Sequence, residues 1–321
     1  MLHIPPNPLD RFCDVYTALL ADRPWWQGKT MLRYCALPLC TLPGEPREIA
    51  SRLDALAEEL KNSTPWYKRS SVGVMLAAQL MRHGGSVAEF TAEVTRAGEL
   101  FRAHWRIFGS TYEALAIEVL RQETSDRRVS AQQVARLAAI WTEMKQDHPI
   151  LTQKSDWPAC ALLAGTNATP QQIRARLEAL YQAIHARGFT RSDALQGATT
   201  LLFFHREEPG VLSARFQDIY GQFKSSGLWM GTEDYDEIAL LCFAPQAPVE
   251  VLTTVQQHRS RIQALLPAPE KQISFSLACG TAVLELLRND ANAALLSQAQ
   301  FLFSIKTVIT AQQAAAAAAA S

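Results

Sequence analysis

The stretch TPQQIRARLEALYQAIHARG, residues 169–188, decides how the rest of the chain is interpreted. Pro170 suits the first turn of a helix, where its missing N–H costs nothing, and Gly188 suits a left-handed helix end. The apolar residues recur at the spacing of one helix face: Ile173, Leu177, Leu180, Tyr181 and Ile184. The stretch therefore predicts an amphipathic helix with one face on a core.

A second kind of segment, a polar residue followed by an Ala/Leu-rich run, alternates with such amphipathic stretches. Examples are STYEALAIEVL (110–120), SDWPACALLAG (155–165) and SDALQGATTLL (192–202). One apolar anchor marks each of these segments along the chain: Met31, Val72, Tyr112, Trp157, Leu195, Tyr235 and Phe275. Successive anchors lie 41, 40, 45, 38, 40 and 40 residues apart, which indicates a repeat of about forty residues.

This alternation predicts an all-α fold of about seven antiparallel helix pairs. We expect the pairs to stack as a right-handed α-solenoid, a superhelix of the HEAT or TPR kind, with a closed α/α toroid as the alternative. Within it we expect a helical-repeat domain over residues 29–286. The flanking parts are an irregular, partly helical N-terminal cap, a C-terminal helical cap and an Ala-rich low-complexity tail: residues 1–28, 287–310 and 311–321.

The bulk composition is that of a globular protein without a charge bias. Of 321 residues, 48% are hydrophobic and 19% charged, and 31 Lys plus Arg balance 31 Asp plus Glu. Without a basic excess, nucleic acid is not expected as a partner. The N-terminal MLHIPPNPLDRF does not resemble a secretion signal, and no apolar run is long enough to span a bilayer. We therefore expect a cytoplasmic protein without membrane insertion.

MKQDHPILTQKSDWPAC, residues 144–160, brings His148, Asp156 and Cys160 together and suggests an acid–base–nucleophile set. Each member also has a structural explanation. His148 precedes a proline and so ends a helix, and Asp156 or the serine before it starts the next one. Cys160 lies in an apolar run, where a thiol stays protonated. We predict a joint between two helices, in which Cys160→Ala is functionally silent.

Acidic residues recur at the starts of the apolar segments: Glu113, Asp156, Asp193 and Asp234. Helix capping is the simpler interpretation. If the pairs stack in register, however, these residues line one rim, and an acidic edge could recognise a basic peptide or an amine. Two aromatic–basic stretches, RPWWQGK (23–29) and TPWYKRSS (64–71), are further candidates for an interaction surface.

Motifs of known chemistry are missing from the sequence. It contains no H-E-x-x-H, no G-x-x-x-x-G-K-[ST], no G-x-S-x-G and no C-x-x-C pair among its six cysteines. No catalytic residue, metal ligand or cofactor is therefore predicted.

The segment MKQDHPILTQKSDWPACALLA (144–164) resembles the K-x-x-H-P-x-L-T…D…LLA signature of a mainly bacterial helical family, domain of unknown function four-thousand-and-three. GFTRSDALQGATTLL (188–202) is similar to the G-F…L-Q…L segment of that family. The resemblance marks eight positions: Lys145, His148, Pro149, Leu151, Thr152, Asp156, Leu195 and Gln196. Many members of that family carry a Ser-His pair shortly after the Leu-Gln. This chain has Ala198, Thr199 and Thr200 there, so a two-histidine site is not expected.

The family name implies no activity, and the function follows from the architecture. We predict a non-catalytic scaffold that binds a protein or peptide partner along a concave face. The alternative is an α/α-toroid enzyme, or a small-molecule binder, with a central acidic site. The candidate binding residues are Lys145, His148, Thr152, Asp156, Asp193, Gln196 and Asp234.

Overall fold

The computed structural model describes residues 4–21, 29–63, 72–105, 110–267 and 273–288. These residues form fourteen α-helices and two short 3-10 helices, with no strand among them. The prediction of an all-α fold is confirmed. Most of RPWWQGK, all of TPWYKRSS and residues 289–321, which include most of the predicted C-terminal cap and the tail, lie outside the described residues.

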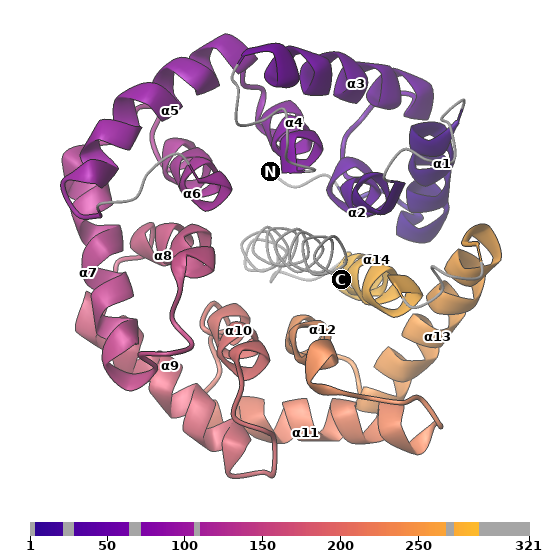
Figure 1. Cartoon of the computed structure of the whole chain (residues 1–321). Helices are drawn as coiled ribbons and strands as arrows, with labels where there is room; N and C mark the ends of the chain where they lie inside the picture. Colours follow the sequence, from indigo (N-terminus) through magenta and orange to yellow (C-terminus); the bar gives the residue numbers. More distant parts are fainter. Residues whose placement is uncertain (1–3, 22–28, 64–71, 106–109, 268–272, 289–321) are drawn as a thin grey trace, which may run out of the picture. The chain divides into compact units, whose positions relative to one another are not determined.

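Odd-numbered and even-numbered helices, labelled in Figure 1, alternate along the chain. The odd-numbered ones are α1 (Pro8–Leu20), α3 (Pro46–Ser63), α5 (Val87–Arg102), α7 (Ala131–Asp147), α9 (Pro170–His185), α11 (Pro209–Ser225) and α13 (Pro248–Leu265). The even-numbered ones are α2 (Lys29–Leu39), α4 (Val72–His83), α6 (Thr111–Gln122), α8 (Trp157–Ala164), α10 (Asp193–Leu202), α12 (Tyr235–Leu241) and α14 (Ser274–Leu286). The 3-10 turns Lys154–Asp156 and Thr232–Asp234 lead directly into α8 and α12.

Burial follows this alternation. Every residue of α8 from Trp157 to Leu163 is buried, and α10 is buried from Leu195 to Leu202. The odd-numbered α7 instead buries one stripe: Val134, Leu137, Ile140 and Met144. The even-numbered helices therefore form an apolar layer and the odd-numbered helices an amphipathic layer, as the two kinds of segment predict.

The helix ends match several of the expected signals. The side chains of Ser86, Ser130 and Thr169 each accept a hydrogen bond from the backbone N–H three residues on. The Glu or Gln side chain at that later position accepts one from the backbone N–H of the Ser or Thr, which completes a capping box. Gly188 and Gly227 follow α9 and α11 with φ of 93° and 85°, where a residue without Cβ avoids strain.

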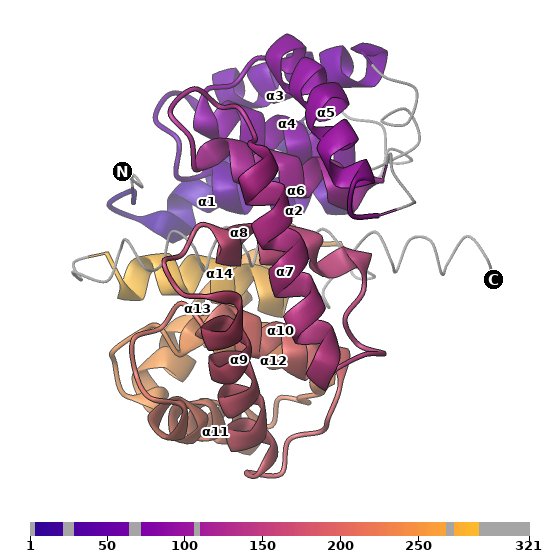
Figure 2. The same cartoon turned by 90° about the vertical axis from the view of Figure 1, so that its left-hand side faces the viewer.

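The described residues divide into two compact units, and α1 and α9 each run from one into the other. The middle unit contains residues 15–174. In it, α2, α4, α6 and α8 pack one against the next, and α3, α5 and α7 cover them. Figure 2 shows α5 and α7 of this unit in front of α6 and α8.

The terminal unit contains residues 4–14 together with the residues described from Ala175 onward. Its apolar layer is α10, α12 and α14, and α11 packs beside α13. The start of α1 belongs here because Arg288 donates to the Pro6 carbonyl, and Arg261 Nη2 lies 3.8 Å from Asp10 Oδ1. The two ends of the described chain therefore pack together within this unit.

Candidate functional site

The α7–α8 joint, residues 145–157, contains four of the predicted binding residues. α7 ends at Asp147, and His148 follows with φ −129° and ψ 63°, outside the helical region. The His148 N–H donates to the Met144 carbonyl (3.2 Å), and the Thr152 N–H donates to the His148 carbonyl (3.0 Å). His148 therefore ends the helix, as its place before a proline predicts.

Trp141 on α7 holds the chain that leads into α8. Its indole Nε1–H donates to the Gln153 carbonyl (3.1 Å), and the Gln153 N–H donates to Asp156 Oδ2 (2.8 Å). Lys145 Nζ lies 4.5 Å from the centroid of the Trp141 ring, a cation–π contact. Asp156 occupies the N-cap position of α8, but its carboxylate closes the preceding 3-10 turn instead of capping the α-helix.

Thr152 and Cys160 lie in the core behind this joint. Thr152 is 2% exposed, and its hydroxyl has no hydrogen-bond partner within the described residues. Cys160 is fully buried, with its Sγ 3.7 Å from Met144 Sδ. Burial raises the pKa of this thiol well above its ordinary value, and such a thiol is a poor nucleophile. The prediction that Cys160 belongs to the core is confirmed.

Three tryptophan rings meet at the α7–α8 joint. The Trp105 ring centroid lies 4.6 Å from that of Trp157 and 6.1 Å from that of Trp141. Trp157 is fully buried, whereas Trp105 and Trp141 are half-buried. Lys154 Nζ lies 5.8 Å from the Trp157 ring. The joint therefore combines partly exposed aromatic surface with lysines.

The α11–α12 joint, residues 220–237, repeats the hydrogen bonds that Trp141 and Asp156 make in the α7–α8 joint. The Tyr220 hydroxyl donates to the Met230 carbonyl (3.0 Å), and the Gly231 N–H donates to Asp234 Oδ2 (2.9 Å). Tyr235 is 4% exposed and takes the buried anchor position at the start of α12. Asp234, another predicted binding residue, thus makes the turn-closing contact that Asp156 makes in the α7–α8 joint.

Arginines of the amphipathic layer hold the chain at the other end of each apolar helix. Arg136 on α7 binds three carbonyls: its Nε donates to Ala164 (2.8 Å), and its Nη2 donates to Thr166 (2.8 Å) and Ala168. Its equivalents bind three carbonyls each: Arg176 those of Phe203, His205 and Glu207, and Arg215 those of Cys242, Ala244 and Gln246. The guanidinium groups satisfy carbonyls that a helix end leaves without intrahelical partners.

These arginines share a sequence pattern that apolar periodicity does not reveal. An arginine stands five residues before an aromatic residue in RAGELF (96–101), RLAAIW (136–141), RLEALY (176–181) and RFQDIY (215–220). In α7 and α11 the aromatic side chain holds the chain that enters the apolar helix, and the arginine holds the chain that leaves it. Comparing polar residues at the forty-residue period would have found this pattern.

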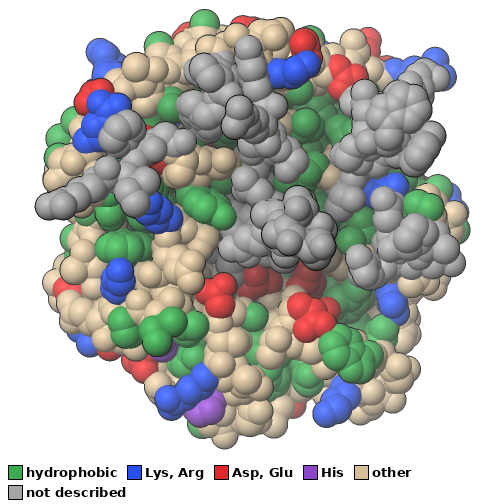
Figure 3. All heavy atoms as spheres, in the orientation of Figure 1, with side chains coloured by type: hydrophobic (Ala, Val, Ile, Leu, Met, Phe, Trp, Pro, Cys, Tyr) green, Lys and Arg blue, Asp and Glu red, His purple; other side chains and the backbone are tan. Residues whose placement is uncertain are grey.

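In the terminal unit, the first turns of α10, α12 and α14 carry a set of polar side chains that we call the acidic row: Asp193, Gln196, Asp236, Glu237 and Ser276. The N-cap of α10 is Ser192, whose Oγ accepts from the Leu195 N–H (3.1 Å). The cap of α10 is therefore the residue before Asp193, at which the cap was expected. Asp193 itself lies exposed in the first turn of the helix. Figure 3 shows acidic side chains over α10 and α12.

Two members of the acidic row are buried without complete hydrogen bonding. Gln196 is 4% exposed, and neither atom of its amide group has a partner in the described part of the chain. Glu237 is 9% exposed, and its Oε2 likewise has none. Burial raises the pKa of Glu237 to about 8, and a hydrogen bond with Ser276, which by itself lowers this pKa, offsets the effect of burial only in part. Burial also raises the pKa of Asp234.

The predicted residues thus fall into two groups. Lys145, His148, Thr152 and Asp156 share the α7–α8 joint, whereas Asp193, Gln196 and Asp234 lie at the starts of α10 and α12. Among the described residues, no three His, Cys, Asp or Glu side chains lie close enough to hold a metal ion. No helix in the described ranges is long and apolar enough to cross a membrane.

Comparison with known proteins identifies a family. The chain is 27% identical over 207 residues to the uncharacterized protein YeaA of Bacillus subtilis (strain 168), a match that covers 64% of this chain and 60% of that relative. The matched part thus spans less than two thirds of the relative. No solved structure matches the chain. A family model matches residues 50–314, and the chain belongs to the family described as "Protein of unknown function (DUF4003)".

Proposed function

We propose that this chain is a non-catalytic helical-repeat protein that binds a basic segment of a partner protein at the acidic row. One observation carries the proposal: the Gln196 amide and the Glu237 carboxyl are both buried, and three of their polar atoms have no partner in the described residues. A buried polar atom left without a hydrogen bond costs about 1–3 kcal/mol, so native proteins keep few of them.

The fold does not need polar side chains at these positions. In α8, Pro158 and Ala159 occupy the two places after the anchor that Asp236 and Glu237 occupy in α12, and α8 forms without a charge there. A group that the helix does not require and that burial penalises is a candidate for binding.

The charge of the row favours a cationic ligand. The first turns of α10, α12 and α14 contain three carboxylates and no lysine or arginine. Lys and Arg side chains carry several N–H donors and no acceptor, so they match the acceptor oxygens of Glu237 and Gln196. A bound cation next to Glu237 would also lower the pKa of this carboxyl and ionise it.

Fluorescence anisotropy tests the proposal with a labelled peptide of alternating lysine and alanine and a matched glutamate–alanine peptide. We expect the lysine peptide to bind, more weakly as salt is added, and the glutamate peptide not to bind. Glu237→Gln and Gln196→Leu should each weaken binding about tenfold, equivalent to about 1.4 kcal/mol.

Asp218→Asn is the matched control, because Asp218 is an exposed acid on α11 outside the row. Equal affinity of the wild-type chain and Glu237→Gln would contradict the proposal. Binding of spermidine with an affinity equal to that of the peptide would favour the alternative, a small-molecule site at the acidic row.

The arrangement of the helix pairs, open superhelix or closed toroid, stays a prediction. Small-angle scattering of the full chain separates the two. An open stack gives a long maximum dimension, whereas a ring of the same pairs gives a short one.

A further inference from the structure

The connection between α6 and α7 departs from the regular arrangement of the repeat. It lies in the longest interval between anchors, the 45 residues from Tyr112 to Trp157. Arg96, at the position equivalent to Arg136, donates to a single carbonyl of this connection, that of Val129 (2.5 Å). Insertions into a repeat array are often binding loops.

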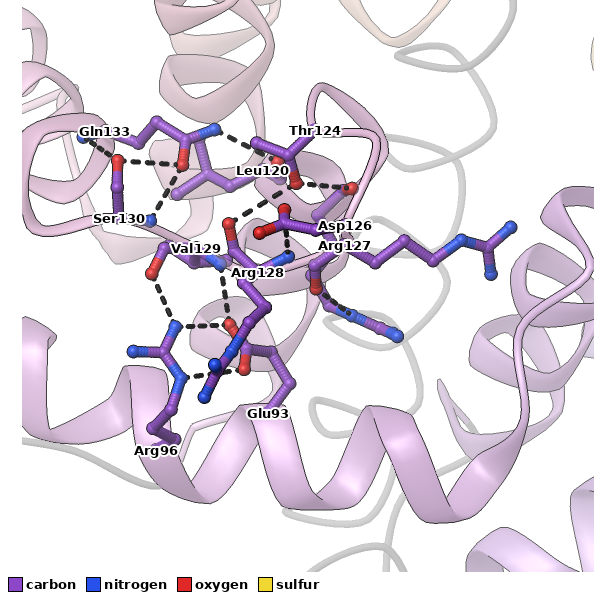
Figure 4. A network of polar contacts seen from close by, with 11 residues as sticks. Glu93, Arg96, Leu120, Thr124, Asp126, Arg127, Arg128, Val129, Ser130 and Gln133 are labelled. Carbon is purple, nitrogen blue, oxygen red and sulfur yellow. Dashed lines mark hydrogen bonds and ion pairs between the residues drawn. The ribbon is translucent and has the colours of Figure 1, made fainter.

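The connection is held in place from α5 (Figure 4). Glu93 Oε1 accepts from the Val129 N–H (2.6 Å), and Arg96 donates to both carboxylate oxygens of Glu93 (2.6 and 2.8 Å). The Arg128 N–H donates to Asp126 Oδ1 (3.1 Å). The backbone around residue 127 is therefore fixed on both sides.

Arg127 has φ 54°, the one positive value among the non-glycine residues that the structure describes. A side chain in the left-handed region is strained, and such strain is found where the surrounding structure holds it for a purpose. The conformation places the Arg127 guanidinium against α4, where Nη2 donates to the His83 carbonyl.

Beneath this connection lies a cavity of about 200 Å³, the α6–α7 pocket, lined by His83, Glu118, Arg121, Gln122, Thr124 and Arg127. The Arg121 side chain is 3% exposed and that of Glu118 is 5% exposed, and they form an ion pair of 2.7 Å. Arg121 Nε also donates to the Arg127 carbonyl (3.3 Å). The ion pair fixes the floor of the pocket.

Positive charge predominates around the pocket. Within the lining, Arg121 and Arg127 are basic and Glu118 is the one acidic residue. Burial, and then the nearby Arg82 and Arg127, lower the pKa of His83 to about 4. His83 is therefore neutral at physiological pH. Hydrogen bonds with Ser86, and to a smaller extent the charges of Arg121 and Arg127, lower the pKa of the exposed Glu89 on α5.

We propose that the α6–α7 pocket binds a phosphate group, with Arg127 as its principal ligand. The guanidinium fork matches the oxygens of a phosphate. The Gln122 amide uses one N–H on Glu118 Oε1 (3.3 Å) and has a second N–H to donate beside it. A cavity of about 200 Å³ accommodates an oxyanion with its first waters. This site is independent of the acidic row: it lies in the middle unit and takes a ligand of opposite charge.

NMR titration of the full chain tests the proposal, with His83 ring signals as the readout. The probes are sodium phosphate, sodium chloride at matched ionic strength, and O-phosphoserine with serine as its control. We expect phosphate to bind and to raise the pKa of His83, because a dianion offsets the neighbouring arginines. Tighter binding of O-phosphoserine than of inorganic phosphate would assign the site to a phosphate monoester, and the reverse to the free ion.

Arg127→Gly removes the guanidinium and keeps the left-handed backbone, so it should weaken phosphate binding at least tenfold with the fold intact. Arg128→Ala, an exposed neighbour outside the pocket, should bind as the wild type does. Arg127→Lys keeps the charge without the fork and should fall between them. The proposal is overturned if phosphate leaves the His83 signals unmoved, or if Arg127→Gly binds phosphate as tightly as Arg128→Ala does.

Discussion

The α7–α8 joint and the α11–α12 joint use the same hydrogen bonds with different charges around them. In each, an aromatic residue of the amphipathic helix donates to a loop carbonyl, and an aspartate accepts from the N–H three residues before it. Besides the turn-closing aspartate, the first joint carries Lys145, Asp147 and Lys154, whereas the second carries Lys224, Glu233, Asp236 and Glu237.

The difference separates residues that position the chain from residues that are available for recognition. Contacts that recur at both joints, such as those of Asp156 and Asp234, are explained by the geometry of the turn. Charges that differ between joints of the same geometry are not required by it. Glu237 belongs to this second group, and burial makes its charge costly.

The largest expected effect tests whether the two joints share one scaffold. Arg136→Ala and Arg215→Ala should each lower the free energy of unfolding by about 2–3 kcal/mol, because each leaves three carbonyls without a charged donor. Urea denaturation measures both. Arg52→Ala, at an exposed position of α3, should change it by less than about 0.5 kcal/mol. Clearly unequal losses at the two arginines would break the comparison.

The next effect concerns pH and distinguishes the joints. The folded-state pKa of Glu237, about 8, lies above its ordinary value of 4.5. Its contribution to stability is therefore full below pH 4.5 and is lost as the pH rises through about 8. In between, stability falls by about 1.4 kcal/mol per pH unit.

Glu237→Gln should remove this dependence and be the more stable protein above pH 8. Between pH 6 and pH values above 8, the difference in free energy of unfolding between variant and wild type should shift in favour of the variant by roughly 2 kcal/mol or more. Urea midpoints of both proteins at a series of pH values give the answer. Parallel pH profiles would mean that the Glu237 carboxyl is not desolvated. Asp156→Asn, in the joint without such a group, serves as the reference.

The smallest effect concerns the two turn-closing aspartates. Asp156→Ala and Asp234→Ala should each cost about 1 kcal/mol, the usual effect of losing a side-chain acceptor of a backbone N–H at a helix start. Thermal unfolding resolves a change of this size. A loss well above that at Asp156 alone would point to a role for the family-signature segment that Asp234 does not share.

Apolar periodicity was enough to predict the alternating helices, because burial of one face or of all faces leaves a direct trace in the sequence. His148 and Cys160 were placed correctly for the same reason: a proline and an apolar run act locally. Asp234 was predicted as the cap of its apolar helix, and Glu237 was not predicted as a site residue. The 3-10 turn before α12 instead directs Asp234 back to Gly231 and leaves Glu237 for the interior.

Residues whose partners are distant in sequence could not be predicted in this way. The carbonyls that Arg136, Arg176 and Arg215 bind lie about thirty residues further on, so no local rule connects donor and acceptor. The α6–α7 pocket likewise depends on contacts between α4, α6 and the connection after α6. The sequence marks that region only by an interval of 45 residues instead of about 40.

The packing of Pro6 and Asp10 against Arg288 and Arg261 sets an order on biosynthesis. Residues 4–14 are synthesised before the rest of this unit, and their partners Arg261 and Arg288 follow about 250 residues or more later. At a synthesis rate of 5–20 residues per second, this separation lasts roughly 12 to 55 s. During that time the first turn of α1 has none of its terminal-unit partners. The described residues of the middle unit all lie between 15 and 174, so this unit can fold while the ribosome is still producing the chain that completes the other.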